Sequence, residues 1–202
     1  MSTDLEQTRH FTTATGADVW FLHPERTPIR GYDLYIHSSR ICRYGGAVEW
    51  TLLQHTALCV ALARRGRIVA EIVPYVAVHD LHEVYVGDVV AALKEVLPEY
   101  KARIETPWEA RVHHALGLCF PLDRSMKGAV KRIDIRALAI EMIFCQHPRA
   151  GVMVDRFVAA GEPIGDGEVM LARAIWREPP AVTWNDIAAD IGVGRLEAAA
   201  NE

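Results

Sequence analysis

The chain has 202 residues, of which 50% are hydrophobic and 24% charged, and its formal net charge is -4 at pH 7. This length and apolar content suit one well-buried domain and are too small for two, so we expect residues 1–202 to form a single domain. The negative charge argues against a general nucleic-acid-binding protein, although a locally basic pocket could still hold a small anionic ligand.

The N-terminus carries no signal-peptide pattern, and no apolar run approaches the ~20 residues of a membrane-spanning helix. We therefore expect a cytoplasmic protein with no membrane partner. The four cysteines contain no C-x-x-C pair, and at least the last three lie among apolar neighbours. We expect buried, reduced thiols at Cys42, Cys59, Cys119 and Cys145.

The predicted elements are helical after an irregular start. Residues 15–23 combine Gly16, alternating apolar positions and a following proline, which is typical of a short strand or hairpin that ends in a turn. Further along, Gly66 suits the end of a helix and Pro74 the first turn of the next. We expect helices at about 36–42, 50–65, 75–85, 107–117, 126–145, 167–176 and 184–199. Strand signals are too few for a larger sheet, so the expected fold class is all-α, with at most a short N-terminal β-hairpin.

The segment from His79 to Asp88 has the most informative sequence, His-Asp-Leu-His-Glu-Val-Tyr-Val-Gly-Asp. Acidic groups and a histidine inside an otherwise hydrophobic helix are costly to bury unless something compensates, and a divalent cation commonly does so. On one helix, His79 and Glu83 would be four residues apart and Asp80 and Glu83 three apart, so their side chains can face one pocket. This pattern predicts one half of a metal site.

His55 and Asp134 are the best candidates to complete that site from other helices, because each interrupts an apolar stretch. Two histidines and two carboxylates suit Mn, Fe, Co, Ni or Zn and leave positions for water or substrate. Simpler explanations exist for both residues. A histidine in an apolar helix is more often a hydrogen-bonded core residue, and Asp134 could pair with Arg132 or Arg136.

The order of these polar residues along the chain resembles a known signature. They are His55, His79, Asp80, Glu83, Asp88 and Asp134. Their order is similar to the H…HD…D pattern of the HD-domain phosphohydrolases, in the branch that includes bacterial 5'-deoxynucleotidases and phage dATP triphosphohydrolases. The likeness extends to the surrounding segments, residues 41–46, 53–56, 79–88 and 131–141. Thr51-Leu52-Leu53 stands where the family has Ser-Val-Ala, and Val84 where Ala is common, but neither departure removes a ligand or an acid.

The resemblance implies an HD-domain helical bundle with a motif-bearing core at about 16–145 and further helices in 151–202. It implies one divalent cation (Mn, Co, Zn, Ni or Fe), and its ligands would be His55, His79, Asp80 and Asp134. Glu83 would orient or deprotonate the attacking water, and Asp88 would relay a proton or contact the sugar. The substrate would be bound by Arg43, Tyr44, Lys94 and Lys131.

The function expected from this resemblance is metal-dependent hydrolysis of a small-molecule nucleotide by a homo-oligomer, a dimer or larger. The leading prediction is a 5'-deoxynucleotidase that converts (d)NMP to nucleoside and phosphate. The alternative is a deoxynucleoside triphosphohydrolase that releases triphosphate, because Lys94 and Lys131 resemble the family's phosphate-binding lysines in position. A non-catalytic nucleotide-binding module is the third prediction, although degenerate members usually lose a ligand or the acid near Glu83, and all are present here.

Overall fold

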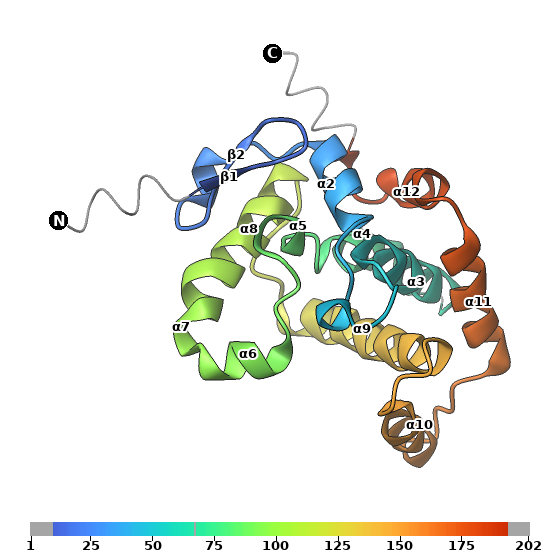
Figure 1. The fold of residues 1–202 in the computed structure, drawn as a ribbon. Coiled ribbons are helices and arrows are strands. Elements are labelled where there is room, and N and C mark those ends of the chain that lie inside the picture. The colour runs from blue at the N-terminus through green and yellow to red at the C-terminus, as the bar shows by residue number, and fades with distance from the viewer. Residues whose placement is uncertain (1–9, 67, 194–202) are drawn as a thin grey trace.

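The structure is a computed structural model that describes residues 10–66 and 68–193. It is built of helices gathered around one central helix, α3, with a small hairpin on one side (Figure 1). The elements are β1 (His10–Thr12), β2 (Asp18–Trp20), η1 (Pro24–Arg26), α2 (Gly31–Ser38), η2 (Tyr44–Gly46), α3 (Leu52–Arg65), η3 (Ala70–Ile72), α4 (Val73–Val78), α5 (Glu83–Val86), α6 (Ala91–Val96), α7 (Pro98–Tyr100), the π-helical η4 (Lys101–Glu105), α8 (Thr106–Ala115), α9 (Arg124–Phe144), α10 (Ala150–Ala159), α11 (Asp166–Arg177) and α12 (Pro180–Ala188). The all-α prediction with a short N-terminal hairpin is confirmed.

The hairpin pairs β1 with β2 antiparallel, with Phe11 opposite Val19. The fully buried carboxylate of Asp33, on α2, binds the turn of the hairpin. That carboxylate accepts hydrogen bonds from the Thr13 hydroxyl at 2.9 Å and the Thr15 hydroxyl at 2.6 Å. The strand or hairpin expected at 15–23 therefore forms, and its first strand lies earlier in the chain than the sequence pattern indicated.

Helix α3 forms the centre of the fold. It begins with a capping box, in which the Thr51 hydroxyl accepts from the Gln54 backbone N–H while the Gln54 side chain accepts from the Thr51 N–H. It ends at Gly66, as predicted. Because its residues are apolar on nearly every side, it packs among α4, α9, α11 and α12 rather than lying at the surface. Any polar residue in its middle is thereby carried into the core.

Helix α9 lies alongside α3 and is the longest helix that the structure describes (Figure 1). Asp123 caps its N-terminus by accepting from the Met126 N–H at 2.9 Å. Arg136 on α9 makes two hydrogen bonds to the Glu168 carboxylate of α11, at 2.7 and 2.8 Å. This bidentate pair ties α11 to the surface of α9.

The prediction of one continuous helix at 75–85 is wrong, because the chain turns between α4 and α5. Around residues 79–82 the backbone hydrogen bonds join residues three apart instead of four. The Leu81 N–H donates to the Val78 carbonyl, and the Glu83 N–H donates to the Asp80 carbonyl. Such tight turns inside a helical segment redirect the side chains that they carry. His79 and Asp80 therefore lie in a turn rather than on one helix with Glu83.

Other helix boundaries also differ from the sequence pattern. The helix expected at 36–42 is α2, which ends at Ser38, because Cys42 instead forms an isolated β-bridge with Thr51. The helix expected at 184–199 is α12, which begins at Pro180 and ends at Ala188. Proline suits a first helical turn, which explains the earlier start. Residues 194–199 of that prediction lie outside the described residues.

The cysteines differ from one another in burial. Cys59 is fully buried, as expected, and Cys145 is half-buried. Cys42 and Cys119 are exposed, so the expectation of burial is wrong for them. All four thiols are free.

One hydrophobic core extends from Val19 of the hairpin to Val193, and it includes Ile175 of α11 and Ile187 of α12. The C-terminal helices thus share a core with the motif-bearing part. Within residues 10–66 and 68–193, every helix is too short or too polar to cross a membrane.

Candidate metal centre

The four predicted metal ligands converge at one point, although they come from α3, the 79–82 turn and α9. His55 Nε2 lies 3.3 Å from His79 Nε2. It also lies 3.5 Å from one carboxylate oxygen of Asp80 and 3.5 Å from one of Asp134. His79 Nε2 is 3.2 Å from the Asp80 oxygen and 3.8 Å from the Asp134 oxygen. All four donor atoms lie within 4.8 Å of one another.

These separations fit a bound cation. Donor atoms about 2.0–2.2 Å from a cation at tetrahedral angles lie about 3.3–3.6 Å apart, and the measured separations run from 3.2 to 3.8 Å. The ring orientation of His79 also fits, because its Nδ1 lies 2.7 Å from the Val76 carbonyl oxygen. An N–H donated to that carbonyl leaves the Nε2 lone pair free to bind a metal.

His55 is oriented by a carboxylate that sequence reasoning did not assign to the site. Its Nδ1 lies 2.5 Å from Glu141 Oε1, and both side chains are fully buried. A histidine that donates Nδ1–H to a carboxylate presents Nε2 to a metal, which is the usual support for a histidine ligand. Glu141 is seven residues after Asp134 on α9, so the two side chains project from the same face of the helix.

Glu141 also connects the predicted substrate-binding pair to the ligands. Its second oxygen accepts from the Tyr44 hydroxyl at 3.1 Å and lies 3.3 Å from Arg43 Nε. The Arg43 guanidinium in turn lies 3.4 Å from a carboxylate oxygen of Asp80. Arg43 and Tyr44 are therefore held beside the metal centre by the same buried carboxylate.

The backbone conformation of Tyr44 supports a role in binding for this segment. Its φ of 58° lies in the left-handed region that residues other than glycine rarely adopt. Strained conformations of this kind persist where the surroundings fix them, and they concentrate at binding sites. Burial and the adjacent Glu141 raise the pKa of the Tyr44 hydroxyl well above its usual value, so the hydroxyl remains a hydrogen-bond donor.

The acids around the centre fall into two groups. The pKa of Asp80 is held well below its usual value, because the neighbouring His79 and Arg43 outweigh the effect of burial. The pKa of Glu83 is raised well above its usual value by burial and by the charges of Asp80 and Asp88. Glu83 is 4% exposed, and its Oε2 is without a hydrogen-bond partner among the described residues. A buried, unsatisfied carboxyl with a high pKa next to a ligand cluster has the properties of an acid–base group.

Asp88 lies close enough to act on the same groups. It follows Gly87, whose φ of 82° requires glycine-like freedom at the end of α5. Its charge raises the pKa of both Glu83 and Arg43.

The two predicted phosphate-binding lysines are both paired with carboxylates. Lys131 donates to the second oxygen of Asp134 at 2.7 Å, while its side chain remains 66% exposed. Lys94 forms an ion pair with Glu105 of η4. His82 lies 3.8 Å from the same Glu105 carboxylate, and His82 together with Lys94 holds the pKa of Glu105 at about 2.

His55 is a buried, hydrogen-bonded histidine, as its simpler explanation predicts, and it also lies among the other three candidate ligands. The simpler explanation for Asp134 does not describe the structure. Asp134 contacts both histidines and Lys131, whereas Arg136 is engaged by Glu168. A further residue that the sequence prediction did not place in the site is Cys59, whose sulfur lies 3.5 Å from His55 Nε2.

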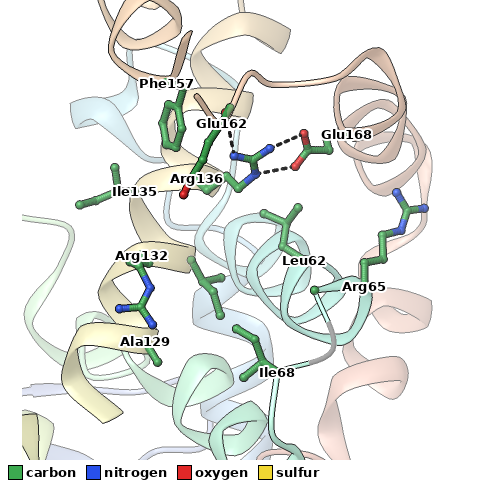
Figure 2. Close-up of a pocket in the computed structure, with 12 residues that line it drawn as sticks. Leu62, Arg65, Ile68, Ala129, Arg132, Ile135, Arg136, Phe157, Glu162 and Glu168 are labelled. Atoms are coloured by element: carbon green, nitrogen blue, oxygen red, sulfur yellow. Dashed lines mark hydrogen bonds and ion pairs between the residues drawn. The ribbon is translucent and has the colours of Figure 1, made fainter. Parts of the chain in front are cut away.

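A separate cavity of about 480 Å³ lies on the other side of this part of the fold. Figure 2 shows it between α3, α9 and α11, with the Arg136–Glu168 pair at one end and Phe157 of α10 beside it. None of the predicted site residues lines this cavity. It is therefore distinct from the metal centre.

Comparison with known proteins identifies one similar segment. No family model matches the chain. "Uncharacterized protein YfdR" of Escherichia coli (strain K12) is 32% identical over 111 residues, which cover 54% of this chain and 57% of that protein. The match thus spans little more than half the length of that relative, whose name states no activity.

Proposed function

We propose that this protein is a metal-dependent phosphohydrolase of the HD-domain type and acts on nucleotides, most simply as a 5'-deoxynucleotidase. The observation that supports this best is the convergence of two oriented histidines and two carboxylates beside the buried carboxyl of Glu83. A structural role alone does not explain that arrangement, because four ionisable groups at such distances would be costly to bury without a cation.

The residues that would hold the cation are His55, His79, Asp80 and Asp134. A divalent cation bound there supplies Lewis acidity and lowers the pKa of a water molecule toward neutrality. This donor set accepts Mn, Co, Zn, Ni or Fe. Glu141 keeps His55 in the tautomer that can bind it, and Val76 does the same for His79.

Glu83 and Asp88 are the groups that would move protons. The raised pKa makes the deprotonated form of Glu83 a stronger base than an ordinary carboxylate, which suits it to accept a proton from the attacking water. Asp88 would pass that proton to the leaving oxygen or contact the sugar. The phosphate would then leave without a covalent intermediate on the protein.

Arg43 and Tyr44 would bind the substrate. The Arg43 guanidinium has donors in a planar fork that matches a phosphate, and one of its nitrogens already lies near Asp80. The Tyr44 ring, held by Glu141, would lie near the base or sugar. This pair is rigid before the substrate arrives, which reduces the entropy lost on binding.

The pairing of the lysines supports a monophosphate over a triphosphate. Lys94 is engaged by Glu105 and Lys131 by Asp134, so neither offers its full charge to additional phosphates. A triphosphohydrolase remains the alternative, because both lysines lie beside the centre. Lys131 is largely exposed, and a triphosphate could compete for it.

We also propose a cytoplasmic, homo-oligomeric protein. Several exposed apolar side chains lie on the C-terminal helices, with Val152 and Val158 on α10 and Met170 and Trp176 on α11. Such residues are suited to an interface between subunits.

Product analysis tests the proposal. Metal-loaded protein is incubated with each dNMP and each dNTP, and the released orthophosphate and triphosphate are measured with and without EDTA. We expect orthophosphate from a dNMP, lost in EDTA and lost in Asp134→Asn. Triphosphate from a dNTP would favour the alternative, and no release from either class with Mn, Co, Ni or Zn would exclude both enzyme proposals.

A further inference from the structure

Cys59 belongs to the hydrophobic core, and its sulfur also lies against the candidate metal ligands. It is on α3, one turn after His55, and is fully buried. Its Sγ lies 3.5 Å from His55 Nε2. Sγ also lies within 4.8 Å of His79, so that Cys59, His55 and His79 form a second possible ligand group.

The two ligand groups overlap. One joins both histidines to Asp80 and Asp134, and the other joins the same histidines to Cys59. A buried cysteine is usually a small apolar residue of the core. Here its sulfur is in contact with the nitrogen that would bind a cation, so the sulfur and the carboxylates can compete for the same ion.

We propose that Cys59 is an alternative metal ligand that recruits thiophilic cations to this centre. The inference rests on the proposed metal centre and adds that the centre has two coordination modes. Harder ions such as Mn²⁺ bind through His55, His79 and the two carboxylates. Softer ions such as Cd²⁺ bind through the two histidines and the Cys59 sulfur, because thiolates select such ions. Zn²⁺ accepts carboxylate and thiolate ligands alike and can use either mode.

The distances agree with this second mode. A tetrahedral cation about 2.3 Å from a sulfur and about 2.0–2.1 Å from a histidine nitrogen holds those two atoms about 3.6 Å apart. The separation between Cys59 Sγ and His55 Nε2 is 3.5 Å. The two histidine nitrogens, 3.3 Å apart, fit the same geometry. As the metal–sulfur bond forms, the thiol proton passes to the solvent.

Cadmium titration tests the inference, because a thiolate bound to Cd²⁺ produces an ultraviolet charge-transfer absorption that nitrogen and oxygen ligands do not. We expect the wild-type protein to develop this absorption up to one equivalent of Cd²⁺. Cys59→Ser should abolish it and weaken Cd²⁺ binding by at least about tenfold. The same variant should bind Mn²⁺ within about twofold of wild type, because Mn²⁺ does not use the sulfur.

Cys119→Ser is the matched control, since Cys119 is an exposed thiol that should not affect the absorption. If Cys59→Ser does not fold, Cys59→Ala replaces it, with folding checked by circular dichroism. Cd²⁺ binding without the absorption, or an absorption that survives in both Cys59 variants, would overturn the role of Cys59 and leave the Mn²⁺ centre intact. Failure of the wild type to bind either ion would overturn the metal centre and this inference together.

Discussion

Glu141→Gln is the substitution that isolates the role of the buried carboxylate. The amide keeps the size of the side chain, and its oxygen can still accept from His55 Nδ1, which now lies 2.5 Å from the carboxylate. Its NH₂ group would then face Arg43 Nε, which is also a donor and now lies 3.3 Å from a carboxylate oxygen. The amide therefore cannot satisfy both partners.

The magnitude follows from these contacts. Removing the carboxylate that supports a histidine ligand typically weakens metal binding by about 10–100-fold, which corresponds to about 1.4–2.8 kcal/mol. Loss of the ion pair with Arg43 and of the charge-assisted hydrogen bond from Tyr44 should lower the free energy of unfolding by about 1.5–3 kcal/mol. We expect both changes, together with a higher KM for the nucleotide, because Arg43 and Tyr44 lose a shared anchor.

Titration calorimetry with Mn²⁺ and steady-state phosphate release measure these effects. Glu168→Gln is the control, since it weakens another arginine–carboxylate pair, the one with Arg136, away from the centre. It should lower stability and leave metal affinity unchanged. A folded Glu141→Gln protein with wild-type Mn²⁺ affinity and wild-type KM would refute the positioning role of Glu141.

Three further predictions concern stability and protons. Thr51→Ala removes the N-cap of α3 and should lower the free energy of unfolding by about 1 kcal/mol in urea titrations; an unchanged value would show that the cap is unimportant. The folded-state pKa of Glu105 is about 2, below its ordinary 4.5, so its charge stabilises the fold above pH 4.5 and that contribution is lost as the pH falls toward 2. Glu105→Gln should therefore be less stable than wild type at neutral pH, with the difference shrinking over that range; a constant difference would contradict the pairing. Burial lowers the pKa of His55 and of His79, but neighbouring acidic groups outweigh it and raise both pKa values well above 6.5. Mn²⁺ binding at pH 7 should therefore release protons. Calorimetry in buffers of different ionisation enthalpy measures this release. Binding heats that do not depend on the buffer would contradict this.

The sequence predicted the four candidate ligands because each stands out locally. His55 and Asp134 interrupt apolar helices, and the structure brings both to His79 and Asp80. The helices at 50–65 and 126–145 could be predicted equally well, because glycine, capping residues and apolar periodicity define their ends. The residues that support the ligands were not predictable in the same way. Glu141 ends the segment 131–141 that resembles the family, but its role was not assigned, because its contact with His55 joins residues 86 apart in the sequence.

The missed elements have physical reasons of their own. Helix α10 was missed although its sequence is largely apolar, and none of its residues is buried. The turn at 79–82 retains helical backbone angles at its ends, and its apolar spacing is the same as that of a continuous helix. Only the packing of this turn against α3, which brings His79 to His55, distinguishes the two.

The most direct test of the metal-dependent mechanism follows bound metal and phosphate release in one titration. Protein stripped with chelator is titrated with Mn²⁺, and the bound ion per chain and the rate of orthophosphate release from a dNMP are measured at each step. The proposed centre predicts that the rate rises in proportion to bound metal and saturates at about one ion per chain. Phosphate release that is already maximal in stripped protein, or metal binding without any release, would contradict it.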